Sequence, residues 1–330
     1  MNKLLLTAIF LIPVSLFSQS NYNNLFLESI ELLERNYIGY KYIKSNKMSH
    51  YGYFKSNLTS DTLTSKGDLI NALAKYISFF EDKHLYLSTK NYYEPSKSSE
   101  NGFQSKFLNS NTYYLRIPSF NNLKAINSVL NYAIQTDSMF QVENLIIDIR
   151  NNSGGKNKYY RRLLPIVATN EIYTRKYELL ATKENWESHM TRNNMPNISD
   201  NVEGLIVDAP WQNHDGKYVL EYKPSGINEL PKRVAILINR NTASSAEKFV
   251  ECAKQSFKVK TFGENTCGAV DFGDIISSEI IKDSLYIVYP TTNVFDFKVN
   301  GVDSKGIAPD FYLDSENQVD QVLKYFKVWH

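Results

Sequence analysis

The chain has 330 residues, and its 37 Lys and Arg side chains nearly balance its 35 Asp and Glu side chains, for a formal net charge of +2. This length suits one large domain or two modest ones. The lack of a basic block in the sequence argues against nucleic acid as a partner. Cys252 and Cys267 have no His or further Cys at metal-ligand spacing, so the sequence predicts neither a metal site nor a cofactor.

The amino-terminal stretch MNKLLLTAIFLIPVSLFSQS has one Lys, then an apolar run, then small and polar residues. An apolar run of about 14 residues is typical of a secretory signal peptide and is too short to span a bilayer. We therefore expect a signal peptide at residues 1–18 and export to the periplasm or the extracellular space. No later stretch of the sequence is long enough for a membrane span. In an oxidising compartment Cys252 and Cys267 could form a disulfide, and two free thiols fit the sequence equally well.

Two apolar patterns with helical spacing, at 23–38 and 67–81, predict a helical subdomain over residues 19–95. The rest of the chain, 96–330, alternates predicted strands with predicted helices. Strands are expected at 111–120 and 234–240, and the stretch 143–155 is expected to be a buried strand that runs into a polar, Gly-ended loop. Helices are expected at 122–136, at 157–169 with Pro165 bending or ending it, and from 244 onward. Apolar strands interleaved with helices predict an α/β (α+β) fold with a mixed sheet covered by helices. The polar stretch 186–216 is expected to be an insertion or a long loop, and the insertion is placed at 171–216.

The segment LIIDIRNNSGG places two glycines just after a buried strand that ends in Asp-x-Arg. Ligands of α/β sheets bind at the carboxyl ends of strands, and the N–H groups of Gly154 and Gly155 could face an oxyanion there. A tight turn explains a lone Gly-Gly at least as well. The spacing is not that of a dinucleotide or phosphate-binding loop.

The segment NRNTASSAEKF follows another apolar strand and begins an amphipathic helix. Ser244 could simply cap this helix, with Glu247 three residues later completing a capping box. It could equally be a nucleophile, because a helix amino terminus presents free N–H groups that stabilise negative charge. The segment EDKHLYL supplies a candidate base: His84 is one of five histidines and the one with apolar neighbours in an ordered-looking context.

The order of these motifs, followed by GENTCG and GIAPD, resembles the C-terminal-processing (tail-specific) serine proteases. The likeness is to their tricorn-like branch, which also includes the retinoid-binding-protein repeats, and it runs from about residue 67 to 313. It implies a crotonase/ClpP-like α/β core. It also implies an exported serine peptidase that acts on peptides or unfolded proteins.

The resemblance assigns Ser244 as the nucleophile and His84 as the general base. It assigns Asp303, just before GIAPD, as the acid that orients the histidine, although the family commonly has Glu there. The oxyanion hole would use the N–H of Ser245 and one from Gly154 or Gly155. A serine needs an adjacent base to be nucleophilic, and an imidazole suits that role.

Three departures from the family pattern narrow the mechanism. The processing branch uses a lysine 25 residues after the serine, and this chain has Ala269 there, which favours a histidine base over a lysine base. The serine that assists the histidine in tricorn is replaced by Lys83. His84 and Tyr113 are too close in sequence for the family's peptide-binding PDZ domain to lie between them.

Two other interpretations remain open from the sequence. Ser245 and Lys248 form an S-x-x-K pattern, as in penicillin-binding proteins, but the SDN at 199–201 precedes it instead of following it. Alternatively the chain could be a non-catalytic ligand- or peptide-binding scaffold of the same fold with a decayed site. Convergence of Ser244, His84 and an acid beneath the Gly154–Gly155 loop would distinguish the peptidase from this scaffold.

Overall fold

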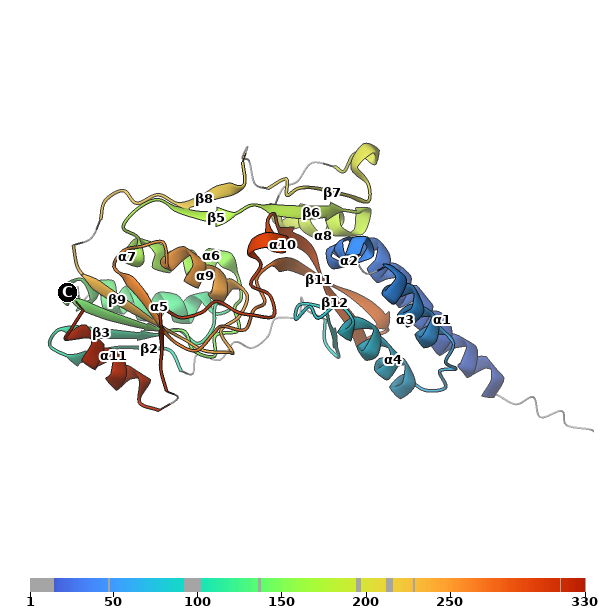
Figure 1. Cartoon of the computed structure of the whole chain (residues 1–330), viewed down its shortest axis with the longest axis horizontal. Coiled ribbons are helices and arrows are strands. Elements are labelled where there is room, and N and C mark those ends of the chain that lie inside the picture. The colour runs from blue at the N-terminus through green and yellow to red at the C-terminus, as the bar shows by residue number, and fades with distance from the viewer. Residues whose placement is uncertain are drawn as a thin grey trace, which may run out of the picture.

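A computed structural model describes residues 15–46, 48–91, 102–135, 138–193, 197–211, 216–227, 229–314 and 316–329 (Figure 1). Most of the expected signal peptide, residues 1–14, lies outside these ranges. Within them, no helix combines the length and the apolar character that crossing a membrane requires.

The larger sheet has six strands in the order β13-β10-β9-β4-β3-β2. Their bounds are β2 Gln104–Asn109, β3 Thr112–Arg116, β4 Asn144–Asp148, β9 Arg233–Ile238, β10 Val259–Gly263 and β13 Phe311–Tyr312. Every neighbouring pair is parallel except the antiparallel hairpin of β2 and β3. The predicted mixed sheet is therefore confirmed, and its parallel strands share one carboxyl edge at which loops can converge.

Helices cover both faces of this sheet (Figure 1). One face carries α5 Leu123–Gln135, α6 Asn157–Tyr160, α7 Leu164–Val167 and α9 Ser245–Ala253, and the other carries α11 Gln318–Phe326. Strand β4 shows why both faces need cover, since Leu145 and Ile147 pack with the first group and Ile146 packs with α11. A strand buried on both faces reads as a continuous apolar run, which is the pattern that predicts it from sequence.

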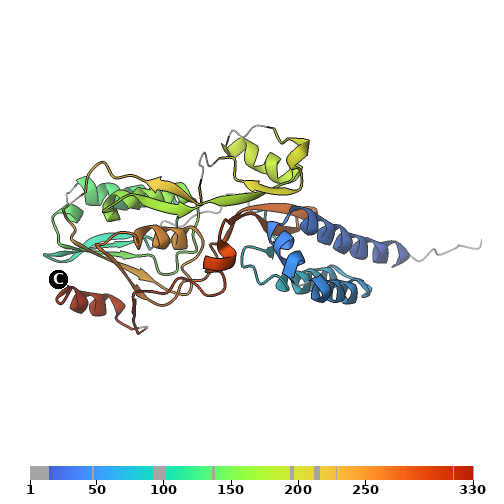
Figure 2. The same ribbon diagram turned by 45° about the horizontal axis from the view of Figure 1, so that its top comes forward.

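The amino-terminal helices form a separate layer at the other end of the molecule (Figures 1 and 2). They are α1 Ser15–Asn36, α2 Ile38–Asn46, α3 Met48–Thr59 and α4 Lys66–Ser78. Their apolar side chains, among them Leu33, Leu73 and Tyr76, pack against Ile287 and Tyr289 of the second sheet. The helical layer thus shares a core with residues of the second sheet that lie far along the chain, between 276 and 289.

The second sheet lies between that layer and the six-stranded sheet (Figure 1). Its strands are β1 Tyr86–Ser88, β6 Tyr177–Ala181, β7 Leu205–Asp208, β11 Phe272–Ile281 and β12 Leu285–Val294. Strand β12 connects most of this sheet, because it pairs with β11, β1 and β6, all antiparallel. Since β1 directly follows the segment that carries His84, this sheet fixes where that segment lies relative to the core.

The structure differs from the sequence-based expectation at 171–216. This stretch contributes β5 Ile172–Arg175, which pairs with β8 Tyr218–Tyr222, and it also contains β6, α8 Lys183–Asn193, a short 3-10 turn at Asp200–Val202 and β7. The stretch 186–216 is therefore not one long loop. Trp186 packs with Leu179, Ala181 and Ala209 in a small separate core. Trp211 also packs against this core, and two tryptophans bring a large apolar area, so the sequence of the lobe can remain mostly polar.

The region 157–169 also differs, because one continuous helix is replaced by α6, a 3-10 turn at Arg161–Leu163 and α7. Pro165 lies in the first turn of α7, where its missing N–H costs nothing. It therefore begins α7, whereas the sequence predicted that it would bend or end a helix. Further short helices are Ser138–Phe140 and α10 Phe297–Asn300. Both cysteines, Cys252 and Cys267, are free thiols in the structure.

Candidate active site

The turn between β9 and α9 holds Ser244 in an uncommon backbone conformation, with φ 55° and ψ −123°. A non-glycine residue with positive φ is strained, and strain of this kind occurs at turns that expose a functional side chain. Surrounding hydrogen bonds maintain it. The Thr242 hydroxyl donates to the Ile149 carbonyl at 3.2 Å, and the Ala243 N–H donates to the Asn152 carbonyl at 2.9 Å. The serine turn is thus tied to the loop that follows β4.

The structure brings His84 to this serine from 160 positions away in sequence, with His84 Nε2 3.2 Å from Ser244 Oγ. Both side chains are half-buried, so a substrate can reach them. A contact of this length is within the hydrogen-bond reach that a general base needs. The geometry therefore suits transfer of the hydroxyl proton to the imidazole.

Glu247 is fully buried and holds the serine turn against the loop at 264–271. Its Oε2 accepts the Ser244 N–H at 2.9 Å and the Ala269 N–H at 2.9 Å. Its Oε1 accepts the Gly268 N–H at 2.7 Å and the Thr266 hydroxyl at 2.6 Å. The carboxylate forms one half of the predicted capping box, but three of its four donors come from a distant loop. Glu247 therefore supports the serine turn in a way that the local sequence pattern could not reveal.

The Gly154–Gly155 loop lies directly against the serine turn. A Cβ placed on Gly154 would lie 2.9 Å from Ser244 Cβ and 3.0 Å from Ser245 N, so only glycine allows this approach. The Gly154 N–H already donates to Asn152 Oδ1 at 2.9 Å. Among the described residues, no acceptor bonds the N–H of Gly155 or of Ser245. These two donors are therefore the better pair for an oxyanion, with Gly154 serving the close approach.

Asp303 does not reach the histidine in this structure. Its Oδ1 accepts the N–H groups of Val270 at 2.7 Å and Asp271 at 2.9 Å. His84 Nδ1 is buried and has no hydrogen-bond partner among the described residues. The expected acid–histidine contact is thus not formed, because this shorter acid is bound to the backbone of the 264–271 loop.

Burial, together with the nearby charges of Asp271 and Asp82, raises the pKa of Asp303 to about 7, against the lowering effect of the two N–H donors. The folded protein therefore keeps this carboxyl protonated to higher pH than the unfolded chain does. The stability that Asp303 contributes is complete below its unfolded pKa of about 4 and is lost as pH rises through 7.

We expect Asp303→Asn to be more stable than the parent at pH 8, by about 2 kcal/mol, and to have no such advantage at pH 4. The Asn oxygen can still accept both N–H groups, but it cannot ionise. Urea unfolding of the two proteins across this pH range measures the difference. A constant difference from pH 4 to 8 would mean that Asp303 does not titrate in this range.

The remaining candidate side chains from the sequence form other contacts. Lys248 is buried, and its Nζ lies 2.6 Å from the Tyr177 hydroxyl, while the Ser245 hydroxyl donates to the Gly155 carbonyl at 2.5 Å. The S-x-x-K pattern therefore forms no dyad. Ala269 occupies the position of the family's lysine and is also buried. Lys83 contacts the loop at 264–271, where its Nζ bonds the Cys267 carbonyl and lies 3.5 Å from Cys267 Sγ.

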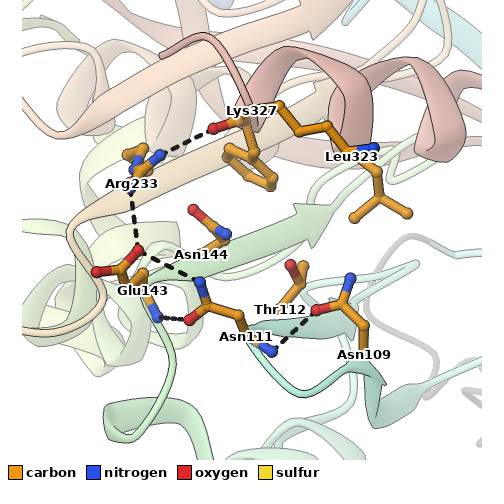
Figure 3. Close-up of a pocket in the computed structure, with 9 residues that line it drawn as sticks. Asn109, Asn111, Thr112, Glu143, Asn144, Arg233, Leu323 and Lys327 are labelled. Atoms are coloured by element: carbon orange, nitrogen blue, oxygen red, sulfur yellow. Dashed lines mark hydrogen bonds and ion pairs between the residues drawn. The ribbon is translucent and has the colours of Figure 1, made fainter. Parts of the chain in front are cut away.

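The cavities that the described residues form include two of interest, and the lining of the smaller contains Asp82, two residues before His84. This cavity has a volume of about 250 Å³, and its lining includes the acidic residues Asp82 and Asp303 and the aromatic residues Phe80, Phe272 and Phe297. The larger, about 360 Å³, lies at the amino ends of the parallel strands (Figure 3). There Arg233 and Asn111 both bond Glu143, around the side chain of Asn144 (Figure 3). Its lining contains no nucleophile paired with a base, so its greater size does not mark it as the reactive site.

Comparisons with known proteins identify the family and the fold of the chain. The sequence profile of peptidase family S41 matches residues 111–313, which is more than half of the chain and includes Ser244 but not His84. A search of curated proteins finds no significant match.

Solved structures share the fold at low sequence identity. A crystal structure described as that of a candidate peptidase from Parabacteroides merdae is 18% identical, with a TM-score of 0.57, and the match covers 92% of each chain. The photosystem II D1 C-terminal processing protease is 14% identical over 89% of this chain and 94% of its own, with a TM-score of 0.50. The tricorn protease is 12% identical over 93% of this chain and 36% of its own, with a TM-score of 0.54. Identities this low show a shared fold, and the profile match carries the assignment: the chain belongs to peptidase family S41.

Proposed function

We propose that this protein is a serine peptidase that cleaves peptide bonds through an acyl-enzyme, with Ser244 as nucleophile and His84 as general base. The observation that carries the proposal is the 3.2 Å contact between His84 Nε2 and Ser244 Oγ at a strained helix entrance. Of the three groups expected to converge, Ser244 and His84 meet while Asp303 stays with the 264–271 loop. A non-catalytic scaffold would not need the Ser244–His84 contact, and this contact alone favours the peptidase.

In the first step Ser244 Oγ attacks the carbonyl carbon of the scissile bond, and its proton passes to His84 Nε2. The N–H groups of Ser245 and Gly155 stabilise the oxygen as it becomes negative. The imidazolium then gives the proton to the departing amine, and the carbon–nitrogen bond breaks. Water, deprotonated by the same imidazole, hydrolyses the acyl-enzyme and restores Ser244.

The substrates that fit this site are peptides and unfolded proteins, because the reactive side chains are only half-buried and the backbone of a substrate must lie beside the Gly154–Gly155 loop. The proposal is tested with reduced casein and a fluorophosphonate probe. We expect the parent to cleave casein and to carry the probe on Ser244. Folded Ser244→Ala should do neither. Equal cleavage by both proteins would leave Ser244 as a helix cap.

We also propose that the protein is exported, on the basis of the apolar stretch at its amino terminus. Expression in a secreting bacterial host should yield a protein whose amino terminus lies near Ser18. The matched control replaces two leucines of the apolar run, Leu4 and Leu5, with Asp, and should leave an uncleaved chain in the cytoplasm. Uncleaved parent protein in the cytoplasm would contradict the proposal.

A further inference from the structure

One carboxylate joins the helical layer to the backbone of the candidate base. Asp82 Oδ1 accepts the N–H of His84 at 2.8 Å. Asp82 Oδ2 accepts the hydroxyl of Tyr37 at 2.8 Å. Tyr37 lies between α1 and α2, so this bridge runs from the amino-terminal helices to the residue beside Ser244.

Tyr37 is held rigidly at its end of the bridge. It is 1% exposed, and its ring meets that of Phe80 edge-on at 5.2 Å. The backbone at Gly39 passes so close that a Cβ there would lie 2.2 Å from the tyrosine ring. Burial raises the pKa of Tyr37 well above its usual value, with the Asp82 charge adding to the effect, so the hydroxyl remains a donor. The Tyr37 side chain is therefore held in one position by its packing and is not a mobile surface group.

The segment at the other end of the bridge is short and strained. Between the end of α4 and the start of β1, Glu81 has φ 55°, and the Leu85 N–H donates to the Asp82 carbonyl at 3.2 Å. Asp82 thus organises the turn with both its main chain and its side chain. The direction in which His84 leaves this turn decides whether its ring meets Ser244.

We propose that Tyr37 and Asp82 are positioning residues that hold His84 in line with Ser244, so that the helical layer is part of the active-site machinery. This inference rests on the proposed peptidase function. It gives a functional role to the amino-terminal helices, which the family profile match does not cover. The charge of Asp82 offers a competing explanation for an effect of this residue on His84, because a carboxylate near an imidazole could act electrostatically. Variants of Tyr37 and Asp82 distinguish the positioning role from the charge effect.

The first experiment compares Tyr37→Phe with Tyr42→Phe in the casein assay. The Tyr42 hydroxyl also links the helical layer to the second sheet, through Glu178 at 2.9 Å and Asn293 at 3.2 Å, and both of these partners lie outside the His84 turn. We expect Tyr37→Phe to lower kcat about tenfold with KM within about twofold, since loose alignment affects the chemical step more than binding. Tyr42→Phe should retain the kcat of the parent. Equal losses in both variants would overturn the proposal.

The second experiment separates geometry from charge at Asp82. In Asp82→Asn the amide oxygen still accepts the His84 N–H, and the amide nitrogen can donate to the Tyr37 oxygen. We expect Asn to retain kcat within about fivefold of the parent, whereas Ala should lose about a hundredfold. If Asn and Ala lose equal activity, the carboxylate acts by charge and the positioning role is wrong.

A third measurement does not depend on catalysis. Hydrogen exchange of the His84 and Leu85 amides should be about tenfold faster in Tyr37→Phe than in the parent, because one hydrogen bond of the turn is lost. Tyr42→Phe should leave these amides unchanged. A parent protein that fails to cleave casein would refute the peptidase function and leave this readout intact. Unchanged exchange in Tyr37→Phe would refute the bridge even in an active enzyme.

Discussion

Replacing His84 with Ala is expected to lower kcat for casein cleavage by about 10⁴-fold, with KM changed by no more than about threefold. Without the imidazole, no group among the described residues stands within hydrogen-bond reach of Ser244 Oγ to take its proton. The two N–H donors of the oxyanion hole remain, so cleavage should still exceed the uncatalysed rate. Initial rates on a fluorogenic casein, with the enzyme in large excess if necessary, measure the loss.

The exposed His50 in α3 offers a matched control, and His50→Ala should keep the parent kcat. A double variant of Ser244→Ala and His84→Ala should lose no more activity than Ser244→Ala alone, because the two groups act as one unit. Additive losses would show that His84 supports something other than the serine. Near-parent activity of His84→Ala would contradict its role as the base.

Replacing Glu247 with Ala is expected to lower the free energy of unfolding by about 4 kcal/mol or more and to abolish cleavage. The substitution leaves four donors without their acceptor in a fully buried place, namely the N–H groups of Ser244, Gly268 and Ala269 and the hydroxyl of Thr266. The strained conformation of Ser244 also loses its support. Chemical denaturation and the casein assay on the same preparation measure the two effects.

Glu247→Gln should fall between Ala and the parent, because the amide oxygen still accepts hydrogen bonds while the amide nitrogen cannot. The control is Glu264→Gln, whose partner Arg240 is highly exposed, and it should change the free energy of unfolding by less than about 0.5 kcal/mol. Should Glu247→Ala retain stability and lose only activity, the carboxylate would be acting in the chemistry and not as a support.

The proposed dyad comes from two separately packed parts of the molecule. Ser244 belongs to the six-stranded sheet with its helices, whereas His84 lies between a helix of the amino-terminal layer and a strand of the second sheet. A shift of one part against the other would separate base from nucleophile. The alignment of this site is therefore a property of the packing between the layers, which is why a tyrosine of the helical layer can matter to the reaction.

Strands and turns could be predicted from the sequence because their residue patterns depend on local burial. The apolar runs of β4 and β9 predict strands covered on both faces, and the glycines at 154 and 155 indicate a close approach of backbone. The order of the motifs indicated the family. The 171–216 region was misjudged in part because a small core around Trp186 needs few apolar residues.

The partners of the buried carboxylates could not be read from the sequence. Glu247 looks like an ordinary capping residue, yet three of its four donors lie about 20 residues further along the chain. Asp303 matches the position of the family's acid but is bound by backbone N–H groups of a neighbouring loop. Asp82 has no local signature, and its partner Tyr37 lies 45 positions away. Sequence alone determines which side chains must be buried and where turns can form, because these depend on nearest neighbours and on periodicity. The tertiary structure alone decides which acceptor each donor meets, because a hydrogen bond requires an approach of about 3 Å that only the packed layers create.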